Sequence, residues 1–176
     1  MEEKTINALR WIISILNKHN IPYGIGGGFA AHMYGSNRKV NDIDFSLSGK
    51  YFPIIVSETK DYITSGPKHY SNAKWDCDTL SLKYNDQEID ITDIDTLRMS
   101  NKEQDKWFKT KDYFRKYETV PIEFQGMIIQ FIDPRDLVAY KKELADQNHL
   151  YQASDVEAVE KYIKAKIIPE NLLMLQ

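Results

Sequence analysis

The stretch IPYGIGGGFAAHMYGSNRKVNDIDFSL, residues 21–47, decides the fold. A short apolar run at 21–25 predicts a strand, and the glycines at 26–28 then lead into a short predicted helix that stops at Gly35. Residues 42–48 alternate between polar and apolar side chains, which is the pattern of a strand with one buried face. The order strand, glycine turn, helix, strand therefore forms the predicted centre of the fold.

Two carboxylates lie on the polar face of the second of these strands. Asp42 and Asp44 are two residues apart, so a strand directs both to the same side. This arrangement suits Mg²⁺ ions that hold the phosphates of a nucleotide. Aspartate is disfavoured in strands, so the pair needs an explanation. A solvated edge strand is the alternative to a metal site.

A third carboxylate follows in a later strand. Residues 80–84 alternate into a polar turn at 85–86, and Asp90 lies between Ile89 and Ile91 on the return strand. If that strand lies beside residues 42–46, the three carboxylates form a triad. Two of them would hold metal ions, and the third would bind one ion or orient an attacking hydroxyl. The alternative is that Asp90 faces solvent near the end of a hairpin.

The glycine turn and Arg38 offer groups for an anion. Gly27 and Gly28 let backbone N–H groups approach an anion at a helix start, although a tight strand-to-helix turn needs the same residues. Phe29 stands where a dinucleotide-binding fingerprint needs its third glycine, which excludes that motif. Arg38 suits either a triphosphate or a structural ion pair.

Lys141 lies on the apolar stripe of a helix that is predicted to begin at Asp133-Pro134. A lysine on such a stripe needs an anionic partner or a route to water. Nucleotide phosphate is one candidate partner. Asp155 is the other, although an acid in the first turn of a helix is favoured there in any case.

The remaining elements define the fold class. We predict helices over residues 5–19, 51–64 and 101–117, a hairpin over 119–124 and 127–132, and a last helix from Ser154, with Glu157 completing a capping box. Strands and helices mix up to residue 132 and helices finish the chain, which predicts an α+β fold with a mixed sheet flanked by helices. The expected division is a core over 1–132 and a C-terminal helical segment over 133–176, packed as one unit.

Composition limits the functions that the chain can have. Its 176 residues carry 23 Lys and Arg against 26 Asp and Glu, a formal charge of -3, which argues against a protein that coats nucleic acid. The basic and aromatic residues at 106–116 fit an amphipathic helix or, alternatively, an RNA contact. One cysteine and no apolar run near ~20 residues lead us to expect a cytoplasmic protein without a disulfide or a membrane span.

The order of these motifs resembles that of the polymerase-β-like nucleotidyltransferase superfamily, and most closely its minimal bacterial members. Those include lincosamide-type antibiotic nucleotidyltransferases and nucleotidyltransferase toxins of AbiEii type. Residues 21–47 carry most of the resemblance. The segment FIDPRDLVAYKKELADQNHLYQASDVEAV, residues 131–159, is similar to the closing helices of the family, in which a lysine and a later aspartate recur.

The resemblance implies roles for individual residues. Asp42, Asp44 and Asp90 would bind Mg²⁺ and carry catalysis, and Gly27 and Gly28 would cradle the triphosphate. Arg38 and Lys141 would contact phosphate or hold the site. The implied reaction transfers a nucleoside monophosphate from an NTP to an acceptor hydroxyl and releases pyrophosphate.

The sequence leaves the acceptor and two rival functions open. The acceptor would be an antibiotic or another small molecule, or else a tRNA or a protein in a toxin-like role. One alternative is a catalytically inactive relative that binds a nucleotide or a partner protein, which an Asp90 turned away from the pair would favour. The other is an RNA-binding module that uses residues 106–116. The nucleobase and the oligomeric state are not determined by the sequence.

Overall fold

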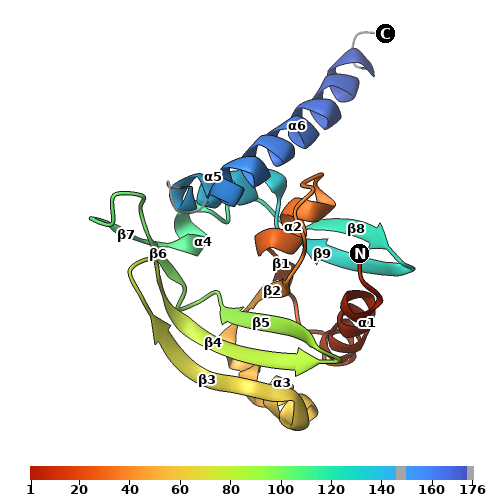
Figure 1. The fold of residues 1–176 in the computed structure, drawn as a ribbon, viewed down its shortest axis with the longest axis vertical. Helices are drawn as coiled ribbons and strands as arrows, with labels where there is room; N and C mark the ends of the chain where they lie inside the picture. Colours follow the sequence, from red (N-terminus) through yellow and green to blue (C-terminus); the bar gives the residue numbers. More distant parts are fainter. Residues whose placement is uncertain (146–149, 174–176) are drawn as a thin grey trace.

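One mixed sheet organises the computed structural model, which describes the backbone of residues 1–145 and 150–173 and the side chains of residues 1–145 and 150–166. Within these residues the sheet has nine strands in the order β7-β6-β4-β5-β2-β1-β9-β8, and β3 pairs with β4 outside this path (Figure 1). The β2–β5 and β1–β9 pairs are parallel and the others are antiparallel. The strands are β1 Gly24–Ile25, β2 Asp42–Leu47, β3 Ile63–Ser71, β4 Trp75–Tyr84, β5 Gln87–Asp93, β6 Arg98–Ser100, β7 Trp107–Lys109, β8 Val120–Phe124 and β9 Met127–Phe131.

Six α-helices accompany the sheet in the same part of the chain, and this set of elements matches the predicted α+β class. They are α1 Glu3–Lys18, α2 Gly27–Met33, α3 Phe52–Thr59, α4 Thr110–Tyr113, α5 Pro134–Leu144 and α6 Leu150–Leu173. Two short 3₁₀ turns, Gly49–Tyr51 and Lys60–Tyr62, flank α3. None of the described helices is both long and apolar enough to cross a membrane.

Strand β2 lies at the centre of the sheet. It pairs with β1 on one side and with β5 on the other, so the alternative of a solvated edge strand is wrong. The alternation predicted for residues 42–48 is confirmed, because Ile43, Phe45 and Leu47 are buried and the residues between them are half-buried. The apolar face of β2 joins one core with the stripe of α1 that contains Leu9 and Ile12. Burial of this face fixes which side of β2 carries the aspartates.

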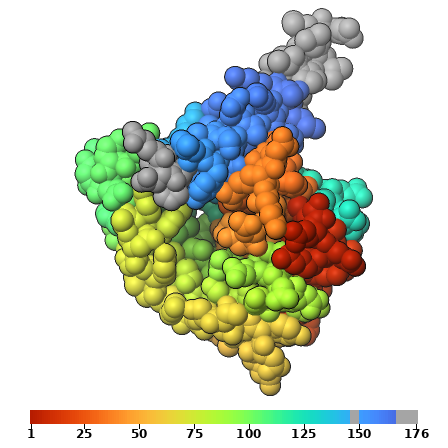
Figure 2. Space-filling view, in the orientation of Figure 1, coloured from red at the N-terminus to blue at the C-terminus, as the bar shows by residue number. Residues whose placement is uncertain are grey.

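The opposite face of the sheet carries polar side chains and opens towards α5 and α6. Figure 2 shows the surface hollowed between the blue C-terminal helices, the orange segment of α2 and β2, and the green and yellow strands. The hollow is a cavity of about 850 Å³ that β2, β4, β5, α2 and α5 all help to line. A volume of this size is typical of small-molecule sites.

Two of the predicted helices are wrong in part. The helix predicted over 51–64 ends at Thr59, and residues from Ile63 onward form β3, because pairing with the long strand β4 outweighs their local preference. The helix predicted over 101–117 is replaced by a loop, strand β7 and the four-residue helix α4. The side chain of Asn101 accepts hydrogen bonds from the backbone N–H groups of Asp105 (3.0 Å) and Lys106 (2.9 Å), and this turn chemistry prevents a helix there.

The closing helices are confirmed with one correction. Helix α5 begins at Pro134 with Asp133 as its N-cap, whose carboxylate accepts a hydrogen bond from the Arg135 backbone N–H at 2.8 Å. The predicted helix start at Ser154 is wrong, because α6 already begins at Leu150 and the Ser154 hydroxyl donates back to the Tyr151 carbonyl at 2.9 Å. Strand β9 ends at Phe131, but the division into units at 1–132 and 133–176 stays a prediction, and part of the second unit lies outside the described residues.

Candidate active site

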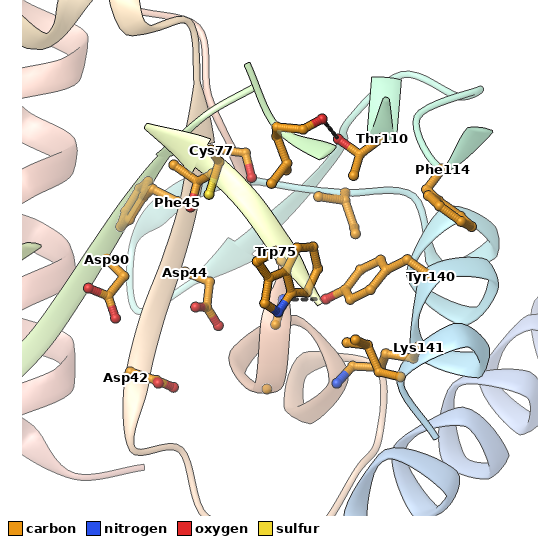
Figure 3. A pocket seen from close by; sticks show the side chains of 18 of the residues that line it. Asp42, Asp44, Phe45, Trp75, Cys77, Asp90, Thr110, Phe114, Tyr140 and Lys141 are labelled. Carbon is orange, nitrogen blue, oxygen red and sulfur yellow. Dashed lines mark hydrogen bonds between the residues drawn. The ribbon is translucent and has the colours of Figure 1, made fainter. Parts of the chain in front are cut away.

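Three carboxylates converge on the polar face of β2 and β5. In the parallel register of these strands Asp44 lies directly opposite Asp90, and Asp42 is two residues away on the same face. One carboxylate oxygen from each of Asp42, Asp44 and Asp90 lies within 4.8 Å of the others. Asp90 therefore faces the pair and does not turn away, and Figure 3 shows the three side chains pointing towards one another. The Ser81 hydroxyl on β4 donates to the Asp90 carboxylate at 2.6 Å and fixes its orientation.

The electrostatics of the triad favour a cation. Burial, followed by repulsion from Asp42 and Asp90, raises the pKa of the Asp44 carboxyl to about 7. The positive charges of Lys141 and Arg38 act in the opposite direction but do not cancel this effect. The cluster thus holds more negative charge than the surrounding side chains neutralise, and a divalent cation would relieve it. Three oxygen ligands with this spacing are of the type that Mg²⁺ binds.

The glycine turn lies against the triad. Gly27 has a φ of +60°, and any side chain there would collide with the Asp44 carboxylate. A side chain at Gly28 would collide with the Arg38 guanidinium. The Gly27 backbone N–H donates to the Tyr140 hydroxyl at 2.8 Å. The two glycines therefore bring Asp44 and Arg38 close to the backbone, while the contact with a triphosphate that the sequence suggested for them stays a prediction.

A buried ion pair joins the two closing helices behind the site. The Lys141 ammonium on α5 donates to Asp155 (2.8 Å) and to Gln152 (2.8 Å) on α6, and both Lys141 and Asp155 are almost fully buried. The other Asp155 oxygen accepts a hydrogen bond from the Ser36 hydroxyl at 2.6 Å. Of the two partners predicted for Lys141, this structure contains Asp155. Lys141 nevertheless lines the cavity, and its charge reaches Asp44.

Arg38 lies between this ion pair and the cavity. Its Nε is 3.6 Å from the Asp155 carboxylate, and its guanidinium stacks 4.8 Å from the centre of the Tyr151 ring. The structural ion pair that the sequence offered as one alternative is thus present, but at long range. The Arg38 side chain also lines the cavity, and its predicted contact with a phosphate stays a prediction.

Several residues of the site were missed by the sequence reasoning. Ser81 was detectable, because a hairpin that turns at 85–86 pairs residue 81 with residue 90, as the structure shows. Tyr140 precedes Lys141 in the same helix but has no pattern of its own. Gln152 reaches Lys141 through the packing of α6 on α5, and Ser36, which follows α2, reaches Asp155 on α6; no local signal indicates either contact.

The fold is that of nucleotidyltransferases of known structure. A candidate nucleotidyltransferase from Thermotoga maritima aligns with a TM-score of 0.62 at 15% identity, over 94% of this chain and 96% of that one. ANT(2'')-Ia in complex with adenylyl-2''-tobramycin aligns with a TM-score of 0.56 at 12% identity, over 92% of this chain and 95% of that one. The lincosamide antibiotic adenylyltransferase LnuA, bound to lincomycin, aligns with a TM-score of 0.53 at 11% identity, over 88% of this chain and 95% of that one.

The sequence also matches the aminoglycoside-2''-adenylyltransferase family over residues 8–162. The chain belongs to this family, and its assignment to the nucleotidyltransferases, a class of enzymes, is confirmed. A search of the curated proteins finds no match. The matched residues include the glycine turn, the three aspartates and the Lys141–Asp155 pair.

Proposed function

We propose that this chain transfers a nucleoside monophosphate from an NTP to a hydroxyl of an acceptor, with Mg²⁺ bound by Asp42, Asp44 and Asp90. The observation that carries the proposal is the convergence of the three carboxylates within 4.8 Å at the wall of the cavity. A triad with this geometry is suited to phosphoryl chemistry, in which metal ions stabilise the charge on the attacking and leaving oxygens. An inactive relative would be favoured by an Asp90 turned away from the pair, and this structure does not show that arrangement.

In the proposed reaction, the residues of the site have different roles. The acceptor hydroxyl oxygen forms a bond to the α-phosphorus, the bond from that phosphorus to its bridging oxygen breaks, and pyrophosphate leaves. Asp90, oriented by Ser81, is placed to accept the hydroxyl proton. Arg38 and Lys141 supply positive charge for the triphosphate, and Asp155 acts as a positioning residue that holds both cations.

A small-molecule acceptor fits the site better than a macromolecule. The cavity of about 850 Å³ is large enough for a nucleotide together with part of a compact acceptor. The formal charge of -3 gives the chain no general attraction for tRNA. Transfer to a tRNA or protein in a toxin-like role is the alternative, and the free cysteine Cys77 is consistent with action in the reducing cytoplasm.

Calorimetric titration of the full chain tests this proposal. Each of the four NTPs is titrated with and without Mg²⁺, into the wild type and into Asp42→Asn/Asp44→Asn. We expect Mg²⁺-dependent binding of at least one NTP to the wild type and none to the double variant, and the preferred NTP identifies the base. Equal binding by the two folded proteins, or none by the wild type, would contradict the proposal.

A further inference from the structure

The part of the cavity that extends beyond the triad lacks negative charge. Among the described residues that line it, the carboxylates are those of the triad alone, whereas three cations, Arg38, Lys141 and Arg115, face it. Once metal ions neutralise the triad, the wall that receives the acceptor is neutral to positive. The charge of this wall therefore selects the charge of the acceptor.

The pleat of β4 explains why nearby acids do not reach the cavity. Trp75, Cys77 and Thr79 line it, so the alternating residues Asp76 and Asp78 point to the opposite face. There His69 contacts both carboxylates, at 2.9 Å and 3.0 Å. Glu88 lies on the same face of β5 as Asp90, but it is exposed at the end of the strand and outside the lining.

Arg115 differs from the other two cations of this wall in the way its charge is balanced. Its guanidinium makes no hydrogen bond or ion pair with any residue that the structure describes, although it is half-buried beside Gly24 and Tyr140. The nearby Asp136 carboxylate attracts the guanidinium but forms no ion pair with it, and its oxygens accept from the backbone N–H groups of Lys116 (3.1 Å) and Tyr117 (3.0 Å). Burial lowers the pKa of Arg115, a sign that its charge is poorly solvated. A half-buried guanidinium that faces a cavity without an ion pair is available to bind an anionic group of a ligand.

Aromatic and apolar side chains surround this charge. Figure 3 shows the Tyr140 ring pointing towards Trp75, and Phe114, Leu97 and Leu144 also line the cavity. Such walls accept flat or apolar groups, and a single charged residue among them fixes the orientation of the bound molecule. The combination is poorly matched to a molecule that carries several ammonium groups.

We propose that the acceptor is a hydroxyl compound with a flat apolar body and one anionic group, a carboxylate or a phosphate, that binds Arg115. This inference rests on the proposed transfer reaction, because it identifies the second substrate of that site. The name of the family refers to aminoglycosides, which carry several positive charges, whereas the acceptor proposed for this chain carries a negative one. The acceptor hydroxyl would then lie towards Asp90, with the anionic group at the Arg115 end of the cavity.

A matched series of glucosides, titrated in the presence of Mg²⁺ so that the triad is neutralised, tests the charge preference without any nucleotide. The 4-carboxyphenyl, 4-methylphenyl and 4-(aminomethyl)phenyl β-D-glucosides share one sugar and one ring and differ in charge, and tobramycin serves as the polycation. Calorimetry with the full chain should give the tightest binding for the carboxylate, roughly tenfold tighter than for the methyl compound, and the weakest for the two amines. Tighter binding of tobramycin, or no preference for the carboxylate, would overturn the inference.

Variants of Arg115 identify the residue responsible. Arg115→Gln should weaken binding of the carboxylate glucoside roughly tenfold to hundredfold and leave the methyl compound unchanged, whereas Arg115→Lys should retain part of the preference. Arg10→Gln, on the exposed face of α1, is the matched control and should change nothing. Weaker NTP binding by Arg115→Gln, with glucoside binding unchanged, would assign Arg115 to the nucleotide and overturn the inference. Failure of the transfer proposal would instead appear in the NTP titrations, which contain no glucoside.

Discussion

Replacing Asp44 by asparagine should stabilise the metal-free protein while abolishing its response to Mg²⁺. The three carboxylates repel one another, and burial together with this repulsion raises the pKa of Asp44 to about 7. The folded state therefore holds a proton that the unfolded chain releases near pH 4. As the pH rises from about 4 to about 7, the metal-free wild type loses stability, and above pH 7 the loss is complete. An asparagine side chain does not ionise, so the Asp44→Asn variant should not show this loss.

The size of the effect follows from the shift in pKa. Each unit of pKa is equivalent to about 1.4 kcal/mol, so the rise from 3.8 to about 7 sets an upper limit of about 4 kcal/mol. Asp44 is half-buried and its carboxylate lines an open cavity, where water screens part of the repulsion. We therefore expect Asp44→Asn to raise the free energy of unfolding by about 1–3 kcal/mol at pH 8, and by close to zero at pH 4.

Urea unfolding in EDTA at a series of pH values measures this difference. Asp61→Asn, an exposed position after α3, is the control and should stay within about 0.5 kcal/mol of the wild type at every pH. Added Mg²⁺ with an NTP should raise the melting temperature of the wild type and of Asp61→Asn but not of Asp44→Asn. An Asp44→Asn protein that is less stable than the wild type at pH 8 in EDTA would refute the reasoning.

Four further substitutions separate the roles within the site. Asp90→Asn should slow transfer by about 100-fold or more in single-turnover assays while largely preserving NTP affinity, because a proton acceptor is lost. Tyr140→Phe removes the acceptor of the Gly27 N–H and should lower the free energy of unfolding by about 1 kcal/mol in urea titrations. Gly27→Ala should destabilise the fold by more than about 1 kcal/mol and abolish Mg²⁺-dependent NTP binding in calorimetry, since its side chain displaces the Asp44 carboxylate. Lys141→Met should cost about 3–5 kcal/mol in urea titrations by leaving Asp155 buried without its lysine, and Lys141→Met/Asp155→Leu should recover part of that stability but not NTP binding.

Each of these expectations has a specific contradiction. Unchanged transfer by Asp90→Asn would remove this residue from proton transfer, and unchanged stability of Tyr140→Phe would mean that water replaces the hydroxyl. Normal NTP binding by Gly27→Ala would show that the turn tolerates a side chain. A double variant at Lys141 and Asp155 that binds NTP normally would limit the ion pair to a structural role.

The sequence predicted the parts of the site that local patterns determine. The alternation of residues 42–48 and the hairpin at 85–86 placed the aspartates on the polar faces of their strands, because burial of one face fixes the other. The parallel pairing of β2 with β5, in contrast, could not be read from local patterns. It joins segments about 45 residues apart in register, and no local period reports such a pairing. The resemblance to a known superfamily, and not periodicity, indicated that Asp90 would meet Asp42 and Asp44.

The cavity wall beyond the triad, which includes Trp75, Phe114 and Arg115, could not be predicted because its residues follow no local pattern. Residues 62–78 form β3 and the start of β4, a pairing with register shifts near Ser65 that alternation alone does not reveal. Residues 101–117 have aromatic spacing that fits a helix, yet the Asn101 side chain and the β6–β7 pairing produce a loop and a short strand. The sequence analysis therefore predicted Arg115 within a helix, whereas the structure places it after α4 in the cavity wall.

The register of β4 connects this fold to substrate choice. Trp75 and Cys77 face the cavity, while Asp76 and Asp78 face away, so a shift of one residue in β4 would exchange an aromatic, neutral wall for an acidic one. An acidic wall suits a polycation, and the wall in this chain suits an anion. A change in the register of one neighbouring strand would therefore alter the charge preference for the acceptor without any change in the three aspartates. In the proposal made above, the triad carries the transfer reaction, and the face that β4 presents to the cavity selects the hydroxyl compound by its charge.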